Sequence, residues 1–260
     1  MNPEVLSSYL PLFTEAFFLT VKIGWIGIGL SLLIGIFCAF ILYFRIPGAC
    51  AFVRCYVELF RNTPLLVQLF FIYYGLPTIG VSISAQVCGA VGLGLLGGSY
   101  MTESFRSGLE AIPVIQTESA VSLGMSRRQL FTSVIQPQAF AISVPGIVAN
   151  VIFLLKETSV FSAISLMDLM FTAKDLIGLY YDTTESLFLL VVFYVVMTLI
   201  FAFGPEVGAL TNLWTMPAVL TGVLVVVSAV MTLIAMASYV PGIKKQVGEF
   251  FAEKKAAKEQ

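Results

Sequence analysis

Three charged residues lie on one face of a predicted helix in the first quarter of the chain. Arg54, Glu58 and Arg61 follow one another at spacings of four and three residues, which brings their side chains to the same side of a helix. Ionisable groups in an apolar environment are costly unless they are paired or face a cavity. Two interpretations stay open: a self-neutralising structural ladder, or a gate or contact between subunits. Gln68 continues the same stripe, and it either lines a path or bridges two helices.

Residue types needed for covalent catalysis and metal binding are scarce. The chain contains no histidine, which is the commonest metal ligand and general base. Its cysteines stand in or beside apolar segments without a paired metal-binding spacing, so we expect buried free thiols. No Gly-Lys-Ser/Thr phosphate loop, Gly-x-Ser-x-Gly elbow or His-Glu-x-x-His helix occurs. We therefore predict no catalytic residue, no metal, no cofactor and no ATP hydrolysis by the phosphate-loop route in this chain.

A polar stretch over residues 102–136 contains the most specific local signal. Pro113 opens a short predicted helix, and Gly124 follows where a helix end favours a left-handed residue. Ser126 and Gln129 have the spacing of a capping box for the next helix. The pattern predicts two short helices joined by a stiff elbow. On these residues alone, the elbow is either an ordinary amphipathic connector or a functional element.

The elements that position these residues are expected to be helices within a membrane. Hydrophobic residues make up 58% of the chain and charged residues 11%, whereas soluble domains carry about 25% charged residues. The mean hydropathy of +0.96 is too apolar for a water-facing surface. Each membrane-spanning helix needs roughly 20 apolar residues. We predict an all-α integral membrane protein. The net charge of −1 says nothing about partners, but the lack of a basic stripe predicts no nucleic-acid partner.

Apolar runs and their polar boundaries divide the chain into a core of expected spans and a C-terminal addition. A break within the second helical region is predicted at Asn62-Thr63-Pro64, where a cap residue precedes a proline. The expected spans and helical regions cover residues 17–44, 52–76, 83–101, 137–155 and 187–203. Residues 156–185 are expected to form a re-entrant or surface-lying segment.

Three regions follow from this division. Residues 1–16 are expected to be an external N-terminal segment, and residues 17–204 the transmembrane domain. Residues 205–260 are expected to add a helix and a charged tail, because the apolar block over 216–240 is long enough to cross a bilayer. We expect this helix to lie at the periphery of the core and to be dispensable for transport.

Lysine and arginine in the short loops predict which side faces the cytoplasm. If the spans alternate, Arg45, Arg54, Arg106, Arg127 and Arg128 fall on one side, which is therefore expected to be cytoplasmic, with the N-terminus external. A further crossing by the final apolar block would place the C-terminal lysines outside, against this rule.

Several motifs in the same order resemble one family of membrane proteins. Glu118-Ser119-Ala120, Gly124 and residues 134–137 resemble the EAA loop of ATP-binding-cassette (ABC) importer permeases. Residues 58–77, 99–113, 136–139 and 156–160 are similar to the polar amino-acid subfamily, the histidine, glutamate, glutamine, arginine and opine type. Ser119 stands where the family has alanine, and Gln136 stands where leucine is usual. The family also ends soon after the fifth span, whereas this chain continues over residues 205–260.

The resemblance implies a five-span permease core with a cytoplasmic coupling helix. Two permease subunits, identical or related, would form the pathway within membrane lipid. Cytoplasmic ATP-binding subunits would dock on the EAA loops, and an extracytoplasmic amino-acid-binding protein would deliver the substrate. By residue match, the candidate ATPase-coupling residues are Glu118, Ser119, Ala120, Gly124, Ser126 and Gln129. The candidate pathway or gate residues are Arg61, Gln68, Glu103, Lys156 and Glu157.

The predicted function is that of a multi-pass permease subunit for a polar amino acid in the cytoplasmic (inner) membrane of a prokaryote. ATP hydrolysis is expected in a separate subunit. The alternative is a secondary transporter or channel that works alone, with Glu58 and Lys156 as ion or proton sites. Inverted repeats would favour this alternative, and the sequence shows none.

Overall fold

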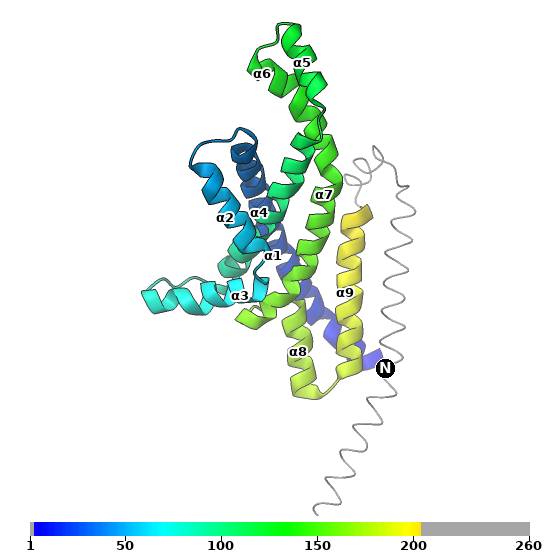
Figure 1. Ribbon diagram of the computed structural model, residues 1–260. Helices are drawn as coiled ribbons and strands as arrows, with labels where there is room; N and C mark the ends of the chain where they lie inside the picture. The colour runs from blue at the N-terminus through cyan, green and yellow to red at the C-terminus, as the bar shows by residue number, and fades with distance from the viewer. Residues whose placement is uncertain (1–2, 204–260) are drawn as a thin grey trace, which may run out of the picture. The chain divides into compact units, whose positions relative to one another are not determined.

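The computed structural model describes residues 3–203, and every regular element within them is a helix (Figure 1). The residues up to Phe201 form one compact unit. In chain order the elements are α1 (Pro3–Tyr43), α2 (Ala49–Arg61), α3 (Leu65–Phe70), the π-helical turn η1 (Phe71–Gly75), the 3-10 turn η2 (Leu76–Ile79), α4 (Ala85–Glu110), α5 (Val114–Ser122), α6 (Arg127–Gln129), the π-helical turn η3 (Leu130–Ile135), α7 (Gln136–Glu157), the 3-10 turn η4 (Thr158–Ile164), α8 (Leu169–Tyr180) and α9 (Thr183–Phe203). The helix predicted over 216–240 and the charged tail lie outside the described residues, so both stay predictions.

The first helix is longer than predicted at its N-terminal end. α1 begins at Pro3 rather than near residue 17, so most of the predicted external segment is helical. Tyr9, Phe13 and Ala16 recur on one face of α1 and are buried against residues of α8 and α9. This distant apolar partner stabilises an extension that the local sequence did not indicate. The 41 residues of α1 extend about 60 Å, roughly twice the thickness of a hydrocarbon layer.

Glycines allow α1 and α4 to pack closely, as predicted for helices in a membrane. A Cβ atom at Gly35 of α1 would overlap Met101, and one at Gly97 of α4 would overlap Ser31. The Ser31 hydroxyl also donates a hydrogen bond to the carbonyl of Leu93, at 3.3 Å, across the contact. Any larger side chain at these two glycines would therefore push the helices apart.

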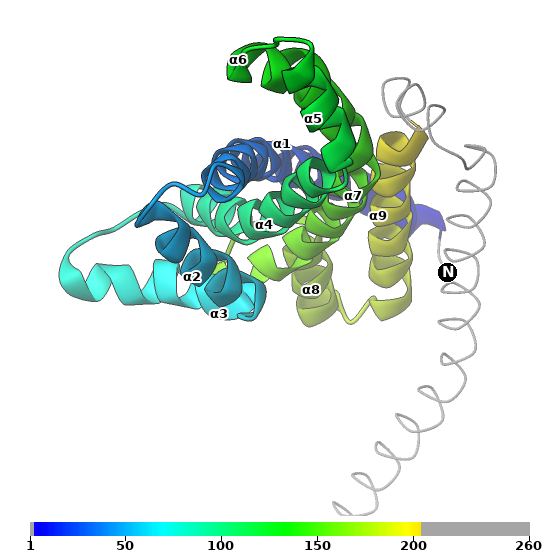
Figure 2. The same cartoon turned by 45° about the horizontal axis from the view of Figure 1, so that its top comes forward.

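The predicted break between the second and third helices is confirmed. The Asn62 amide donates to the Glu58 carbonyl at 2.7 Å, and the Thr63 hydroxyl donates to the Leu59 carbonyl at 2.7 Å, so both side chains close the end of α2. Pro64 has an extended backbone, with φ −58° and ψ 142°, and directly precedes α3. After this break, α3, η1 and η2 lie across the long helices (Figures 1 and 2).

The cysteines are free thiols, as predicted. Cys38 and Cys88 are buried, and Cys50 is partly buried. The prediction that the cysteines are buried is wrong for Cys55, which is exposed. The reason is that α2 buries the face that carries Val53 and Val57 and leaves Cys55 outside.

The predicted polar stretch forms the end of the unit that α5 and α6 occupy, beyond the ends of α4 and α7 (Figures 1 and 2). α4 continues past the predicted end near residue 101 to Glu110. α6, η3 and α7 follow one another without a break from Arg127 to Glu157, so the start predicted at Pro137 is too late. Pro137 does not end the run, because the wider π-helical turn η3 stands directly before it.

The segment predicted as re-entrant or surface-lying, residues 156–185, contains η4 and α8. α8 buries Leu169, Ala173 and Leu176 against α1 and α9. α9 returns beside α8, and it begins at Thr183 rather than at residue 187 (Figure 1). The depth of this hairpin in a membrane stays a prediction.

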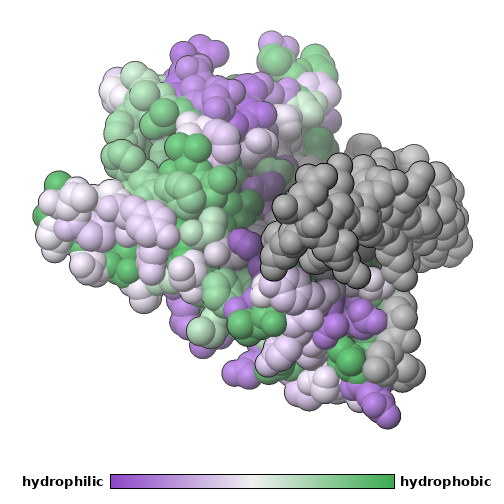
Figure 3. Space-filling view, turned by 90° about the horizontal axis from the view of Figure 1, so that it is seen from below, coloured by the Kyte–Doolittle hydropathy of each residue, from purple (hydrophilic) through white to green (hydrophobic). Residues whose placement is uncertain are grey.

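Length and composition allow three helical stretches of the described residues to cross a membrane: Glu4–Tyr43, Arg127–Ile164 and Thr183–Phe201. A shorter apolar stretch covers Leu65–Ile79. α4, predicted as a span over 83–101, contacts α1, α2, α3 and α7. Its buried face is rich in small residues, which allow close packing of helices, whereas contact with lipid favours bulky apolar side chains. Viewed from the end opposite α5, apolar residues lie interspersed with polar ones over the surface (Figure 3).

Candidate functional site

A charged cluster forms where α2 ends against α4. Arg61, the last residue of α2, places its Nη1 atom 3.6 Å from Oε1 of Glu103 on α4. The Arg61 guanidinium also lies over the ring of Tyr100, 5.2 Å from its centroid. Two different groups of α4 therefore hold the Arg61 side chain in place.

The charged ladder runs along α4 rather than along α2. Arg106 donates from Nε to Glu103 at 2.8 Å and from Nη1 to Glu110 at 2.6 Å. These hydrogen bonds, first to Glu103 and then to Glu110, raise the pKa of the Arg106 guanidinium, so it stays charged. With Arg61 on the other side of Glu103, the pairs form a chain of alternating charge.

The structure therefore contradicts the predicted ladder of ion pairs among Arg54, Glu58 and Arg61. Arg54 and Glu58 are exposed, and neither forms an ion pair with another residue of the part that the structure describes. Arginine four residues before glutamate is the less favourable order on a helix, and exposed pairs contribute little. Arg61 instead binds Glu103, a partner that helical spacing within α2 does not indicate.

Two adjoining open cavities bring three of the five predicted pathway residues together. One, of about 340 Å³, is lined by Arg61, Asn62, Tyr100 and Glu157 together with apolar side chains. The other, of about 400 Å³, shares Arg61, Asn62 and Tyr100 and adds Glu103. Both volumes fall within the range of small-molecule sites. Three helices, α2, α4 and α7, thus contribute charged side chains to one region.

Sequence reasoning missed Asn62 and Tyr100 as lining residues. Asn62 was interpreted only as a cap, although it directly follows Arg61. Tyr100 stands three residues before Glu103, which is the spacing of neighbours on one helix face. That spacing is the signal that would have identified it.

Gln68 and Lys156 lie away from these cavities. Gln68 is buried, and its Nε2 atom donates to the carbonyls of Phe60 and Thr63 at 3.0 and 2.9 Å. It thereby bridges the break between α2 and α3, which favours the bridging interpretation over the path. Lys156 is exposed at the end of α7, while the next residue, Glu157, faces the cavity. Neighbouring residues of a helix point in different directions.

The elbow has the predicted backbone geometry. Gly124 follows α5 with φ +79°, which is the left-handed conformation. Its N–H donates to the Val121 carbonyl at 2.9 Å. The capping box is present: Ser126 N–H donates to Gln129 Oε1 at 2.9 Å, and Gln129 N–H donates to Ser126 Oγ at 3.4 Å. Both helix ends at the elbow are thus closed by hydrogen bonds.

A small apolar core fixes the elbow to the rest of the unit. Ala120, Leu130 and Ile135 are buried together. Side chains from α1, α4, η3 and the connections before and after α5 pack against them, namely Tyr43, Leu109, Ile112, Met125, Phe131 and Val134. In addition, Gln138 Nε2 of α7 donates to Gln116 Oε1 of α5 at 2.9 Å. The elbow is therefore a packed structure rather than a loose loop.

The outer side of α5 is open and largely apolar. Val114, Ile115 and Leu123 are exposed, the last to 83%. Glu118 and Ser119 are also exposed, whereas Ala120 faces the small core. Of the predicted coupling residues, Glu118 and Ser119 therefore face outward and Ala120 is buried. The others, Gly124, Ser126 and Gln129, shape the elbow.

The chain matches one protein family over most of its length. The family described as "Binding-protein-dependent transport system inner membrane component" matches residues 31–207. The chain belongs to this family. It is accordingly a multi-pass membrane permease subunit of an ABC importer, and the predicted family and permease fold are confirmed.

Individual relatives support the same assignment. The probable glutamine ABC transporter permease protein GlnP of Bacillus subtilis is 33% identical over 164 residues, covering 63% of this chain and 75% of GlnP. The probable amino-acid ABC transporter permease protein PatM of Vibrio harveyi is 34% identical over 168 residues, covering 64% of this chain and 75% of PatM. Neither relative supports the alternative of a transporter or channel that works alone.

Solved structures show the same fold. A chain in the crystal structure of an amino acid ABC transporter with histidines is 32% identical, with a TM-score of 0.73, and the match covers 78% of this chain and 94% of that chain. A chain of the inward-facing MetNI methionine ABC transporter is 20% identical with a TM-score of 0.67, covering 81% of this chain and 100% of that chain. The latter likeness concerns the fold alone.

Proposed function

We propose that this chain forms part of the pathway by which a polar amino acid crosses the cytoplasmic membrane of a prokaryote. Relatives named for glutamine, arginine and octopine transport support this substrate class. The observation that carries the proposal is the meeting of Arg61, Glu103 and Glu157 around two adjoining cavities. Charges of both signs at membrane depth are costly and are expected to serve a function.

The charge arrangement suits a zwitterion. Glu103 and Tyr100 hold the Arg61 guanidinium, whose remaining N–H groups can donate hydrogen bonds to a carboxylate. Glu157 lines the same cavity and forms no ion pair with another described residue. Its carboxylate is therefore available to an α-ammonium group. Asn62 adds an amide to the lining, and Tyr100 adds a hydroxyl.

We infer that a second permease subunit, identical or related, faces these open cavities and completes the pathway. An extracytoplasmic binding protein would deliver the amino acid. ATP hydrolysis would occur in cytoplasmic subunits that dock on α5, where Val114, Ile115 and Leu123 offer an apolar surface and Glu118 a charge. If the ATP-binding subunits bind α5 more tightly in one state of the pathway than in the other, this difference in affinity would supply the coupling free energy.

The test uses the reconstituted importer and compares two neighbouring substitutions. Glu157→Gln keeps the shape of the side chain and removes the charge that lines the cavity. A lost charged hydrogen bond is worth about 1.5–3 kcal/mol, so we expect amino-acid affinity in the permease to fall roughly tenfold to hundredfold. Lys156→Gln, beside it but away from the cavities, is expected to have a smaller effect.

Two measurements separate pathway defects from assembly defects. Co-purification of the ATP-binding subunit reports assembly, and uptake at varied amino-acid concentration reports the pathway. If Glu157→Gln transports with wild-type kinetics, the cavity is not part of the path. If both neighbouring variants lose uptake equally, the loss does not depend on the cavity.

A further inference from the structure

A groove beside the N-terminal half of α1 is expected to lie at the level of the lipid headgroups. Residues 23–43 of α1 contain no charged side chain and extend roughly 30 Å, which matches the thickness of the hydrocarbon layer. Arg45 follows this run at the end expected to be cytoplasmic, and Lys22 precedes it at the other end. Lys22 therefore stands where the hydrocarbon gives way to phosphate groups.

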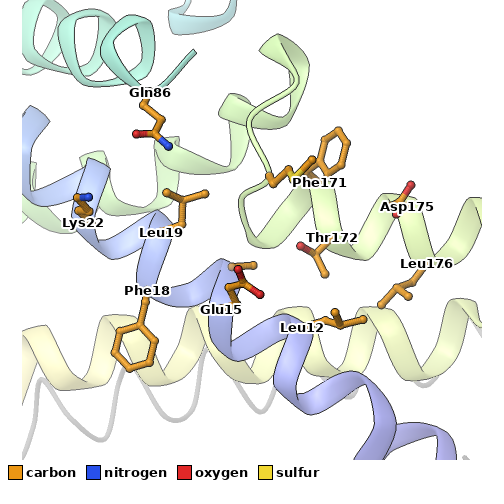
Figure 4. Close-up of a pocket in the computed structure, with 12 residues that line it drawn as sticks. Leu12, Glu15, Phe18, Leu19, Lys22, Gln86, Phe171, Thr172, Asp175 and Leu176 are labelled. Atoms are coloured by element: carbon orange, nitrogen blue, oxygen red, sulfur yellow. The ribbon is translucent and has the colours of Figure 1, made fainter. Parts of the chain in front are cut away.

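The groove has a volume of about 600 Å³ and lies between α1, the first turn of α4 and α8 (Figure 4). Its walls are mostly apolar, with Leu12, Phe18, Leu19, Met167, Phe171 and Leu176 among the lining residues. Figure 4 shows Lys22 and Gln86 at one end of the groove, and Glu15 and Thr172 further along it. Asp175 lies beyond them on α8.

The charged side chains of this groove are not paired with one another. Lys22, Glu15 and Asp175 are exposed, and none forms an ion pair or hydrogen bond with another residue among those described. Glu15 stands seven residues before Lys22 on the same face of α1, roughly 10 Å further from the hydrocarbon run. The groove thus offers a cation near the membrane and carboxylates farther out.

We propose that this groove binds the headgroup of a phospholipid with a primary ammonium group, such as phosphatidylethanolamine. The phosphate of such a lipid lies next to the hydrocarbon, and its ammonium lies farther out, which is the order of Lys22 and Glu15. Lys22 and the Gln86 amide donate to the phosphate, while Glu15 and Asp175 accept from the ammonium. The apolar walls receive the upper part of the acyl chains.

Other lipids fit these charges less well. Phosphatidylcholine has a bulky quaternary ammonium without N–H donors, so the carboxylates of Glu15 and Asp175 gain no hydrogen bond from it. Phosphatidylglycerol is anionic and brings no positive group to the carboxylates. Among these phospholipids, the groove therefore favours one with a primary ammonium group.

The experiment measures the lipids retained by the complete importer. The complex is assembled in nanodiscs of equal parts phosphatidylethanolamine, phosphatidylcholine and phosphatidylglycerol, then released and analysed by native mass spectrometry. We expect phosphatidylethanolamine to be enriched about tenfold over phosphatidylcholine, which corresponds to about 1.4 kcal/mol. Glu15→Gln with Asp175→Asn is expected to remove this enrichment while phospholipid binding continues. Lys22→Gln is expected to lose the retained lipid, and Lys22→Arg to keep it.

A matched control makes the same change from lysine to glutamine outside the groove: Lys174→Gln on α8, at an exposed position. This variant is expected to keep the enrichment. Equal retention of the three lipids by the wild-type complex overturns the proposal, as does enrichment that survives the double substitution of Glu15 and Asp175. Displacement of the lipid by excess free glutamine or arginine would show an amino-acid site instead, and would also overturn it.

Discussion

Replacing Gly124 by valine tests whether the elbow transmits force from an ATP-binding subunit. Gly124 has φ +79°, and no atom lies within 4 Å of the place that a Cβ would occupy. The cost of a side chain is therefore backbone strain alone, about 1–2 kcal/mol for a residue with a Cβ and more for a β-branched one. A penalty of 1–2 kcal/mol changes the ratio of two conformations by roughly 5- to 30-fold.

Gly80→Val provides a matched control. Gly80 has φ +86° and equally open space around its Cβ position, but it follows η2, far from the coupling elbow in sequence. Both variants are expected to lose similar thermal stability. Only Gly124→Val is expected to lose retention of the ATP-binding subunit in a pull-down, together with amino-acid-stimulated ATP hydrolysis. Gly124→Asn is expected to retain more coupling, because asparagine adopts the left-handed conformation at lower cost.

The outcome that refutes this reasoning is specific. If Gly124→Val retains the ATP-binding subunit and drives uptake at the wild-type rate, the elbow is only a connector. If Gly80→Val uncouples ATP hydrolysis to the same extent, backbone strain acts through general stability and not through the elbow.

Double-mutant cycles of unfolding are expected to distinguish the ion pairs. Arg61→Gln and Glu103→Gln should couple by less than about 1 kcal/mol, because their 3.6 Å pair is partly exposed. Arg54→Gln and Glu58→Gln should be additive, and coupling above about 0.5 kcal/mol would restore the ladder on α2. Burial raises the pKa of Asp168 from 3.8 to about 7, so the folded chain keeps a proton that the unfolded chain releases. The free energy of unfolding is therefore expected to fall as pH rises from about 4 to about 7 and to level off above. Asp168→Asn keeps a cap acceptor for α8 and is expected to remove this contribution; an unchanged pH slope would contradict the assignment.

Features that depend on a few neighbouring residues were predictable from the sequence. The left-handed Gly124, the capping box of Ser126 and Gln129, and the break before Pro64 all arise from hydrogen bonds or steric limits within about four residues. Neighbouring residues alone determine these features, and contacts with the rest of the fold do not alter them.

Features that depend on distant partners were not predictable in the same way. α1 begins early because Tyr9 and Phe13 pack on helices more than 150 residues later, and because the Tyr9 hydroxyl donates to Asp182 at 2.6 Å. Arg61 leaves its expected partner because α4 brings Glu103 to it. Spacing along one helix states which side chains share a face, but not which other helix that face meets.

The helical run from Arg127 to Glu157 is unbroken and roughly 45 Å long, so it connects the elbow to a carboxylate that lines a cavity. Between these ends α7 packs closely on α4: a Cβ at Gly108 would overlap Ser143, one at Gly146 would meet Ser104, and Asn150 Nδ2 donates to Ser104 Oγ at 2.9 Å. A displacement at the elbow would therefore involve α4, which carries Glu103, as well as α7, which carries Glu157.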